Sequence, residues 1–385
     1  MSPGPDPGLV GPPSEAPGPA GPEVTTVGYD EVVIHTPAGP DGSGGWRPAE
    51  AHRFADLAPD TEHRLMGLTV RTLPRPPGEL LAVVATLNDL HFGETRAGHI
   101  EGSDVGPVLS SGPGEAPYPL TMNGAAAADI AALDRCLPTG LLGAVVAKGD
   151  LTDAGARADL DAFEACYRAF GDRLHAIPGN HDVAGGPVEF GPGPFGRRPP
   201  FEVVLDGVIL ALLDTTIAGW PTGRVSPEQI EWLDELGARA DRPVLVLGHH
   251  HAWDPGYSNR SPTYYGINPE DSEALVAVVA RRPRLAGYFA GHTHRNRVRQ
   301  FGPTGAFPWV EVASVKEFPG CWAEYRIHEG GAVQILRRLD APEALEWSER
   351  TRALYHGHYT AYAFGASPAD RCFPIPFDRP LPRRH

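Results

Sequence analysis

The chain has 385 residues, of which 41% are hydrophobic and 21% charged, a composition that excludes an intrinsically disordered protein. Its 33 lysine and arginine residues against 48 aspartate and glutamate residues give a net charge of −15, which disfavours nucleic acid and anionic membranes as partners. No apolar stretch reaches the roughly 20 residues of a membrane-spanning helix, and the four cysteines form no CxxC pair, so we expect a soluble protein with free thiols.

The N-terminal fifth of the chain divides into two segments. Residues 1–24 are rich in proline and glycine and cannot bury enough apolar surface to fold, so we expect a disordered tail. This tail lacks the basic and apolar regions of a secretory signal, which predicts a cytoplasmic location. Residues 25–76 are predicted to form a small β appendage. Its β-forming runs, separated by Gly, Pro and Asp turns, are 24–27, 31–35 and 64–72.

Residues 77–340 are predicted to form the main domain, because strands and helices alternate along it, as in layered α/β proteins. Buried strands are expected at 81–87, 143–147, 174–177, 208–213, 244–247 and 285–290. Helices are expected at 123–136, 156–170, 226–240 and 269–282. Further β-type runs follow at 309–315, 321–328 and 332–338. The last two of these predict an antiparallel hairpin. Residues 341–385 are expected to be a C-terminal tail with one helical stretch and then Pro-rich coil.

Polar side chains follow five of the predicted strands. The five clusters are Asn88-Asp89-Leu90-His91, Gly149-Asp150, Gly179-Asn180-His181-Asp182, Gly248-His249-His250-His251 and Gly291-His292-Thr293-His294. In an open α/β sheet, ligands bind outside the carboxyl ends of the strands, so all five clusters should converge on one crevice. The glycine before four of the clusters is expected to allow a tight turn. Imidazole and oxygen donors without cysteine favour Mn, Fe or Zn, so the sequence predicts a metal site.

These clusters resemble the calcineurin-like metallophosphoesterases, whose pattern is D-x-H, G-D, G-N-H-[DE], H and G-H-x-H in that order. The resemblance covers roughly residues 80–300. It implies an α/β fold, a layered β-sandwich flanked by helices (the metallophosphoesterase fold), preceded here by the small β appendage. It also implies two divalent metal ions as cofactors.

The resemblance assigns each ion its own ligands and gives the two ions one shared carboxylate. The ligands of one ion would be Asp89, His91 and His294. Those of the other ion would be Asn180, His249 and His292. Asp150 would bridge the ions, and His250 would lie behind the ligands and support them.

The resemblance also implies a mechanism. Two metal ions lower the pKa of a shared water, so a metal-bridging hydroxide would attack phosphorus. His181 is implied to contact the phosphate and to protonate the leaving oxygen, with Asp182 orienting its ring. The alternatives are a hydrogen bond from His181 that only fixes its loop, and a helix-capping role for Asp182.

The form Gly149-Asp150-Leu151-Thr152-Asp153 lacks the arginine found after this block in protein Ser/Thr phosphatases. It resembles bacterial class III cyclic-nucleotide phosphodiesterases and glycerophosphodiesterases. We therefore predict an enzyme that hydrolyses small phosphodiesters, first a cyclic nucleotide such as 3′,5′-cAMP. The alternatives are a phosphomonoesterase or nuclease of the same superfamily and, more remotely, a non-catalytic protein-binding scaffold. No nucleic-acid or membrane partner is expected, and a homodimer is possible.

Three long loops leave the metal-bearing strand ends at residues 92–122, 183–200 and 252–268. Long loops in compact domains often serve binding. The last loop carries four aromatic residues that could stack on a nucleobase or pack on the surface, namely Trp253, Tyr257, Tyr264 and Tyr265.

Overall fold

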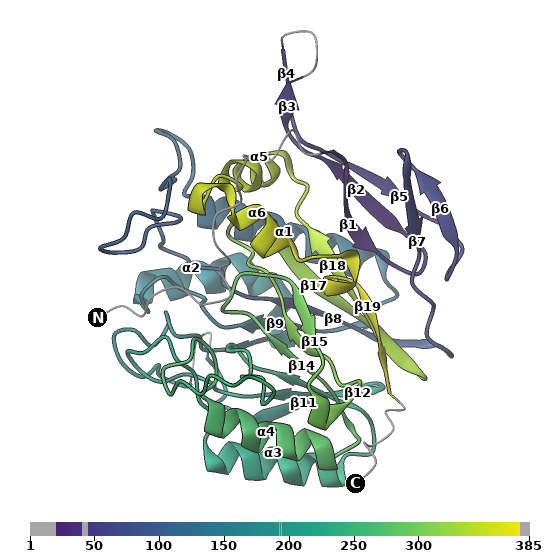
Figure 1. The fold of residues 1–385 in the computed structure, drawn as a ribbon, viewed down its shortest axis with the longest axis vertical. Coiled ribbons are helices and arrows are strands. Elements are labelled where there is room, and N and C mark those ends of the chain that lie inside the picture. Colours follow the sequence, from purple (N-terminus) through teal and green to yellow (C-terminus); the bar gives the residue numbers. More distant parts are fainter. Residues whose placement is uncertain (1–20, 41–44, 192, 194, 378–385) are drawn as a thin grey trace.

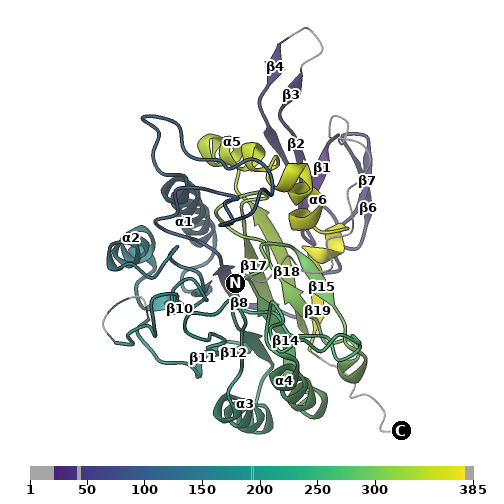
Figure 2. The same cartoon turned by 60° about the vertical axis from the view of Figure 1, so that its left-hand side comes forward.

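The computed structural model describes residues 21–40, 45–191, 193 and 195–377. Two six-stranded β-sheets pack against each other, and helices cover their outer faces (Figures 1 and 2). This arrangement confirms the predicted layered α/β sandwich.

The first sheet has the strand order β10-β9-β8-β17-β18-β19. Its strands are β8 (Leu80–Leu87), β9 (Leu142–Lys148), β10 (Leu174–Ile177), β17 (Cys321–His328), β18 (Gly331–Arg338) and β19 (Phe373–Pro376). Strands β8, β9 and β10 are parallel, whereas β17, β18 and β19 continue the sheet in antiparallel pairs. The loops that follow β8, β9 and β10 therefore leave the sheet at one edge.

The second sheet has the strand order β11-β12-β13-β14-β16-β15. Its strands are β11 (Phe201–Leu205), β12 (Val208–Leu212), β13 (Val244–Leu247), β14 (Leu285–Ala290), β15 (Arg297–Arg299) and β16 (Trp309–Glu311). The four central strands are parallel, and β11 and β15 are antiparallel edges. The loops after β13 and β14 therefore also leave at one edge.

The helices cover the two outer faces of the sandwich and bury an apolar layer on each. The α-helices are α1 (Tyr118–Cys136), α2 (Arg157–Tyr167), α3 (Pro227–Arg239), α4 (Pro269–Arg281), α5 (Pro342–Thr351) and α6 (Tyr359–Phe364). The 3₁₀ helices are η1 (Arg168–Arg173), η2 (Gly302–Thr304), η3 (Tyr355–Gly357) and η4 (Pro368–Asp370). Helices α1, α2, α5 and α6 pack on the first sheet, and α3 and α4 on the second. Among the described residues, none of these helices is long and apolar enough to cross a bilayer.

The start of α3 shows how local sequence sets these elements. Ser226 is the N-cap, and its side-chain oxygen accepts a hydrogen bond from the amide of Gln229 at 3.4 Å. Pro227 occupies the first helical position, where no intrahelical donor is needed. The helix start predicted from the sequence is confirmed.

The N-terminal region forms a three-stranded antiparallel sheet and two hairpins. The sheet contains β1 (Glu23–Val27), β2 (Val32–Thr36) and β5 (Glu50–Phe54), and the hairpins are β3 (Gly39–Pro40) with β4 (Trp46–Arg47) and β6 (Glu62–Leu65) with β7 (Leu68–Arg71). The run predicted at 64–72 is thus part of a hairpin, because Met66 and Gly67 turn the chain with φ of 50° and 81°. Of the disordered tail predicted at 1–24, residues 1–20 lie outside the described residues, and β1 already begins at Glu23.

The prediction of a tail at residues 341–385 is wrong for its described part. Strand β19 pairs with β18 and extends the first sheet, and α5 and α6 pack on the same sheet. Phe373 and Ile375 are buried, whereas Pro374 and Pro376 alternate with them at exposed positions. Because β19 is an edge strand, its prolines need not donate to a further strand, and a sequence typical of coil can therefore pair.

A buried charge network fastens the N-terminal region to the first sheet. Glu31, whose side chain is 8% exposed, accepts hydrogen bonds from Arg53 at 2.7 Å, Arg326 at 2.9 Å and Arg337 at 2.5 Å. Burial alone would raise the pKa of Glu31, but Arg337, with Arg326 and Arg53, outweighs it and lowers the pKa to about 2. Glu31 is therefore ionised in the folded protein over most of the acidic range.

We expect Glu31→Gln to lower the free energy of unfolding at pH 7 by about 3 kcal/mol, because it leaves buried guanidinium groups with less compensating charge. A lowered folded-state pKa stabilises the fold above the unfolded value of 4.5, and this contribution is lost as the pH falls through about 2. The difference from wild type should therefore shrink between pH 4.5 and 2. Urea unfolding at several pH values tests this, with the exposed Glu62→Gln as control. A pH-independent difference would contradict it.

Candidate metal centre

The loops after β8, β9, β10, β13 and β14 meet at the carboxyl ends of these strands. Backbone hydrogen bonds tie the loops together, since Asp89 N donates to Gly149 O at 3.1 Å and His91 N to Asp150 O at 3.0 Å. In the second sheet, Gly291 N donates to His249 O at 2.9 Å, and His292 N donates across the sandwich to Asp89 Oδ1 at 3.1 Å. In the loop after β10, His181 N donates to Asp150 Oδ1 at 2.9 Å. The backbone thus brings together the five clusters that were predicted to converge.

Four of the predicted ligands form one group. The ligand atoms of Asp89, His91, Asp150 and His294 all lie within 4.8 Å of one another. His91 Nε2 is 3.6 Å from Asp150 Oδ2, and His294 Nε2 is 3.4 Å from Asp89 Oδ1. Asp89, His91 and Asp150 are buried, and the His294 side chain is 18% exposed. This group matches the first predicted ligand set together with the predicted bridge.

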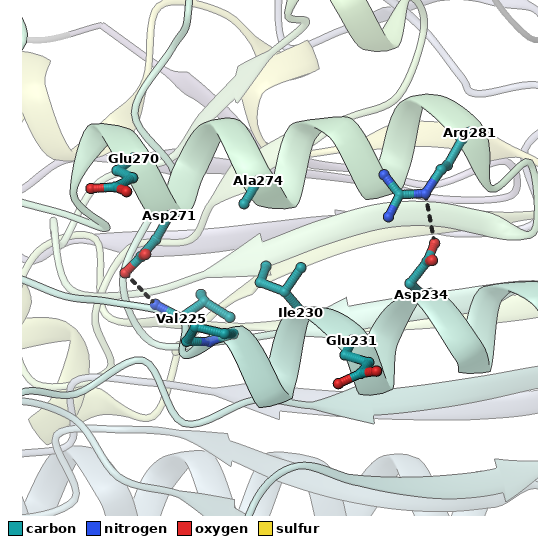
Figure 3. Close-up of a pocket in the computed structure, with 9 residues that line it drawn as sticks. Val225, Ile230, Glu231, Asp234, Glu270, Asp271, Ala274 and Arg281 are labelled. Carbon is teal, nitrogen blue, oxygen red and sulfur yellow. Dashed lines mark hydrogen bonds and ion pairs between the residues drawn. The ribbon is translucent and has the colours of Figure 1, made fainter.

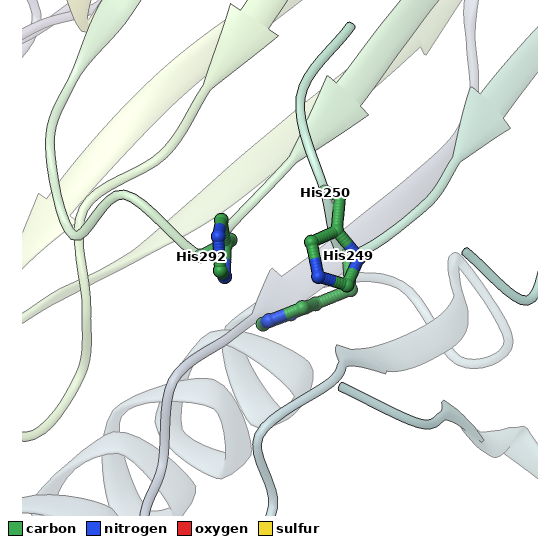
Figure 4. A group of neighbouring side chains, drawn as sticks. All are labelled: His249, His250 and His292. Atoms are coloured by element: carbon green, nitrogen blue, oxygen red, sulfur yellow. The ribbon is translucent and has the colours of Figure 1, made fainter. Parts of the chain in front are cut away.

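A second group lies beside the first, on the loops after β13 and β14. Figure 4 shows the rings of His249, His250 and His292 together, and their ligand atoms lie within 4.8 Å of one another. His249 Nε2 is 3.1 Å from Asn180 Oδ1 and 3.3 Å from Asp150 Oδ2. The Asp150 carboxylate therefore lies next to both groups.

Buried imidazole nitrogens in these groups lack hydrogen-bond partners. Within the described chain, they are both ring nitrogens of His91 and Nε2 of His250 and of His292. Burial lowers the pKa of all three rings well below the usual value, so they are neutral. An unsatisfied buried polar group costs about 1–3 kcal/mol, and a bound cation would satisfy these lone pairs. The residues therefore fit divalent ions that accept nitrogen and oxygen ligands.

Five of the predicted ligands also have a left-handed backbone. Their φ values are 55° at Asp89, 49° at His91, 51° at Asp150, 67° at His292 and 53° at His294. Residues with a Cβ atom pay roughly 1–2 kcal/mol each for this conformation. Such strain collects at functional sites, where the surrounding structure maintains it.

Comparison with known families accounts for this arrangement. A family model described as calcineurin-like phosphoesterase matches residues 82–296, which contain all five clusters. The chain belongs to the calcineurin-like phosphoesterase family.

Curated members of the family share modest identity with this phosphoesterase. A glycerophosphodiester phosphodiesterase, GpdQ of Enterobacter lignolyticus, is 27% identical over 194 residues, or 48% of this chain and 66% of the relative. A 3′,5′-cyclic adenosine monophosphate phosphodiesterase, CpdA of Vibrio vulnificus, is 29% identical over 160 residues, or 40% of this chain and 54% of the relative. The chain thus spans less than two thirds of the length of these two relatives. Among solved structures, a dimetal phosphatase from Danio rerio aligns with a TM-score of 0.48 at 14% identity, covering 68% of this chain and 98% of that one.

The structure separates His181 from Asp182, which were predicted to act together. His181 Nδ1 lies 2.7 Å from the carbonyl oxygen of Asp153, so Nε2 is the nitrogen left for a substrate. Asp182 accepts hydrogen bonds from the amides of Leu151 at 3.1 Å and of Thr152 and Gly179 at 2.9 Å. The predicted orientation of His181 by Asp182 is therefore wrong. Asp182 fastens the loop after β9 to the loop after β10, and a backbone carbonyl holds the His181 ring instead.

His250 occupies a more central position than the supporting one predicted for it. Its Nδ1 is 2.8 Å from Thr215 Oγ1, which fixes the ring. Its Nε2 belongs to the same group as His249 and His292, and its ring lies 4.4 Å from that of His292. His250 therefore offers a further nitrogen donor to this group.

Several residues that hold the ligands escaped the sequence analysis. His249 Nδ1 lies 2.9 Å from the carbonyl oxygen of Lys148, and His294 Nδ1 lies 2.6 Å from Glu317 Oε1. Asn88 Nδ2 donates to Asp89 Oδ2 at 2.5 Å. Partners of this kind fix the tautomer and direction of metal-binding imidazoles. In the sequence these partners could be recognised just by their position, as a polar residue next to a predicted ligand or within an apolar run.

Neighbouring carboxylates determine the protonation of two of the imidazoles before an ion binds. Burial alone would lower the pKa of His294, but Asp89 and Glu317 outweigh it and raise the pKa to about 10. Asp150 likewise raises the pKa of His249 to about 9 against the effect of burial. Because a metal ion binds neutral imidazole, binding at neutral pH displaces protons from these two rings.

Two of the glycines in the clusters lie so close to neighbouring residues that a Cβ atom would not fit. A Cβ atom on Gly149, which has a φ of 88°, would lie 2.5 Å from His249 Nδ1. A Cβ atom on Gly179 would overlap the amide nitrogen and Oδ1 of Asp150. Of the four glycines before the clusters, all of which are described, Gly149 alone has a positive φ. The tight turn predicted for all four is thus found at one of them, and Gly179 is needed for space.

A groove of about 410 Å³ lies between α3 and α4, away from the centre (Figure 3). Two of its four carboxylates are already engaged, since Asp234 pairs with Arg281 at 2.9 Å and with Arg282 at 2.7 Å. Asp271 accepts a hydrogen bond from the amide of Val225 at 3.1 Å. None of the predicted site residues lines this groove, so it is not part of the metal centre.

Proposed function

We propose that the protein is a dinuclear metal-dependent phosphodiesterase that acts on a cyclic nucleotide such as 3′,5′-cAMP. The observation that carries this proposal is the position of Asp150 Oδ2, 3.6 Å from His91 Nε2 and 3.3 Å from His249 Nε2. One carboxylate between two groups of ligands is the arrangement expected of a bridging ligand. Two divalent ions bound here would supply nucleophile activation and charge stabilisation on the phosphoryl oxygens.

In this proposal His181 acts on the substrate directly. Its side chain is 39% exposed, and its ring lies 4.5 Å from that of His91, so it borders the centre from the solvent side. With Nδ1–H held by the carbonyl of Asp153, the ring protonated on both nitrogens can donate from Nε2 to a phosphoryl oxygen and pass that proton to the leaving oxygen. The Asp153 carboxylate lies 3.7 Å from Nδ1 of both His91 and His181, at the border of the centre.

The proposed substrate class is supported by the phosphodiesterase activities for which the relatives are named and by Tyr265. The Tyr265 ring lies 4.1 Å from that of His292 at an interplanar angle of 32°, and the residue is 41% exposed. It offers a partly open aromatic face beside the centre on which a nucleobase could stack. Trp253, named with it from the sequence, is 1% exposed, so a stacking role for Trp253 is wrong.

The decisive experiment compares substrates for protein purified with Mn²⁺. The substrates are 3′,5′-cAMP, glycerophosphocholine, p-nitrophenyl phosphate and a single-stranded oligonucleotide. We expect the highest kcat/KM on cAMP, with loss of activity in chelator. Preference for glycerophosphocholine would favour the second candidate function, suggested by the similarity to GpdQ. Preference for the monoester or the oligonucleotide would overturn the proposal.

We expect Tyr265→Ala to raise KM for cAMP about 10-fold, because stacking on a base is worth about 1–3 kcal/mol. Its KM for glycerophosphocholine, which has no aromatic group, should stay within about twofold of wild type. Tyr257→Ala is the matched control, since Tyr257 lies in the same loop with 43% exposure but contacts Arg297, which is not a predicted ligand, through its hydroxyl at 3.2 Å. An equal effect of Tyr265→Ala on both substrates would contradict a stacking role.

A further inference from the structure

A tyrosine from the C-terminal part of the chain reaches the first group of ligands. Tyr359, the first residue of α6, is 4% exposed, and its hydroxyl donates to Glu317 Oε1 at 2.5 Å. The same oxygen lies 2.6 Å from His294 Nδ1. Glu317, in the segment between β16 and β17, therefore connects Tyr359 on α6 to the predicted ligand His294.

The Glu317 carboxylate is held at both oxygens. Lys316 Nζ lies 3.9 Å from Oε2 and also forms a 2.6 Å ion pair with Glu94, in the loop that follows His91. Lys316 and Glu317 are 4% and 3% exposed, so these charges are shielded from water. A buried carboxylate with a cation on one oxygen and two donors on the other has little freedom to rotate.

This arrangement fixes His294 in one tautomer and one direction. Glu317 accepts the proton on Nδ1, so Nε2, which lies 3.4 Å from Asp89 Oδ1, is the nitrogen that would bind an ion after losing its proton. The hydrogen bond from the Tyr359 hydroxyl fixes the position of Glu317 Oε1. Without it, the His294 ring is the one donor to Oε1 left among the described residues, and the carboxylate can turn toward Lys316.

We propose that Tyr359 is a positioning residue for one metal ion, the ion assigned to Asp89, His91 and His294. Acting through Glu317, it raises the affinity of that ion and leaves the ion assigned to Asn180, His249 and His292 unaffected. The inference rests on the proposed dinuclear function. It makes α6 part of the metal centre, although none of the predicted ligands lies on this helix.

The hydroxyl can be removed without removing the ring. The Tyr359 ring packs against Tyr355 and Tyr362, with centroids 5.4 and 6.1 Å away, and Tyr359→Phe keeps this packing. A matched control is Tyr325→Phe, because the Tyr325 hydroxyl is also buried and donates to Gln334 at 2.9 Å, within the first sheet. Both variants lose one buried hydrogen bond, but only Tyr359 contacts the partner of a predicted ligand.

The test is calorimetric titration of Mn²⁺ into the metal-free full chain. We expect two ions in wild type, a 10- to 100-fold weaker affinity for one of them in Tyr359→Phe, and an unchanged second ion, since outer partners of ligands typically contribute this much. Excess Mn²⁺ should restore phosphodiesterase activity to Tyr359→Phe. Tyr325→Phe should bind both ions like wild type.

Binding of both ions to Tyr359→Phe with wild-type affinity would overturn the inference, as would equal weakening by Tyr325→Phe. Glu317→Gln provides a second variant, which keeps the size of the side chain and should weaken the same ion. A wild type that binds a single ion would instead overturn the dinuclear function. In that case, weaker binding of this ion by Tyr359→Phe would still support the positioning role.

Discussion

Asp150→Asn is expected to lower kcat/KM on the diester substrate about 1,000-fold, which corresponds to about 4 kcal/mol of transition-state stabilisation. Asp150 Oδ2 is the atom close to both His91 and His249, and Oδ1 accepts a hydrogen bond from His181 N at 2.9 Å. Asparagine fills the same space but removes the negative charge and replaces one oxygen by a donor. Both ions should therefore bind more weakly, and elemental analysis should find less metal per chain.

The control for this variant is Asp161→Asn on α2, whose side chain is 56% exposed and pairs with Arg157. Exposed pairs contribute about 0–1 kcal/mol, so this variant should retain full metal content and activity. Wild-type activity and metal content in Asp150→Asn would contradict the bridging role and the proposed function with it. A folded Asp150→Asn protein that loses only activity would place Asp150 in catalysis but not in metal binding.

The residues that the sequence identifies share one property: each lies in the loop that follows a strand. Asp89 follows β8, Asp150 follows β9, Asn180 follows β10, and His249 and His292 follow β13 and β14. Because these strands are parallel within each sheet, their order along the chain was sufficient to predict a common edge. The sequence alone therefore predicts the convergence of the five clusters.

Contacts between distant segments could not be predicted in this way. Glu317 lies 23 residues from His294, and Tyr359 lies 42 residues from Glu317. No local periodicity relates such positions, and tertiary packing alone brings them together. For the same reason the sequence predicts the wrong partner for His181. Its ring is held not by the adjacent Asp182 but by the carbonyl of Asp153, which lies 28 residues earlier in the chain.

Gly179→Ala should reduce metal binding and activity although it changes no ligand. A Cβ atom at this position would overlap the amide and Oδ1 of Asp150, and the first of these is backbone that cannot rotate away. The loops after β9 and β10 would have to separate, which should lower the free energy of unfolding by about 1–3 kcal/mol. Since Asn180 is the next residue, its amide oxygen would move with the loop. A displacement of about 1 Å at a reacting centre can cost about 100-fold in rate, and we expect a loss of that order.

Gly185→Ala is the matched control, because the same substitution in the same loop places a Cβ atom with no other atom within 4 Å. It should retain wild-type stability, metal content and activity. Thermal unfolding with and without Mn²⁺ separates the two effects of Gly179→Ala: the metal-free protein reports the overlap itself, and the stabilisation by Mn²⁺ reports the ligand geometry. If Gly179→Ala keeps the full Mn²⁺ stabilisation, the close approach of the two loops is not what sets the positions of Asp150 and Asn180.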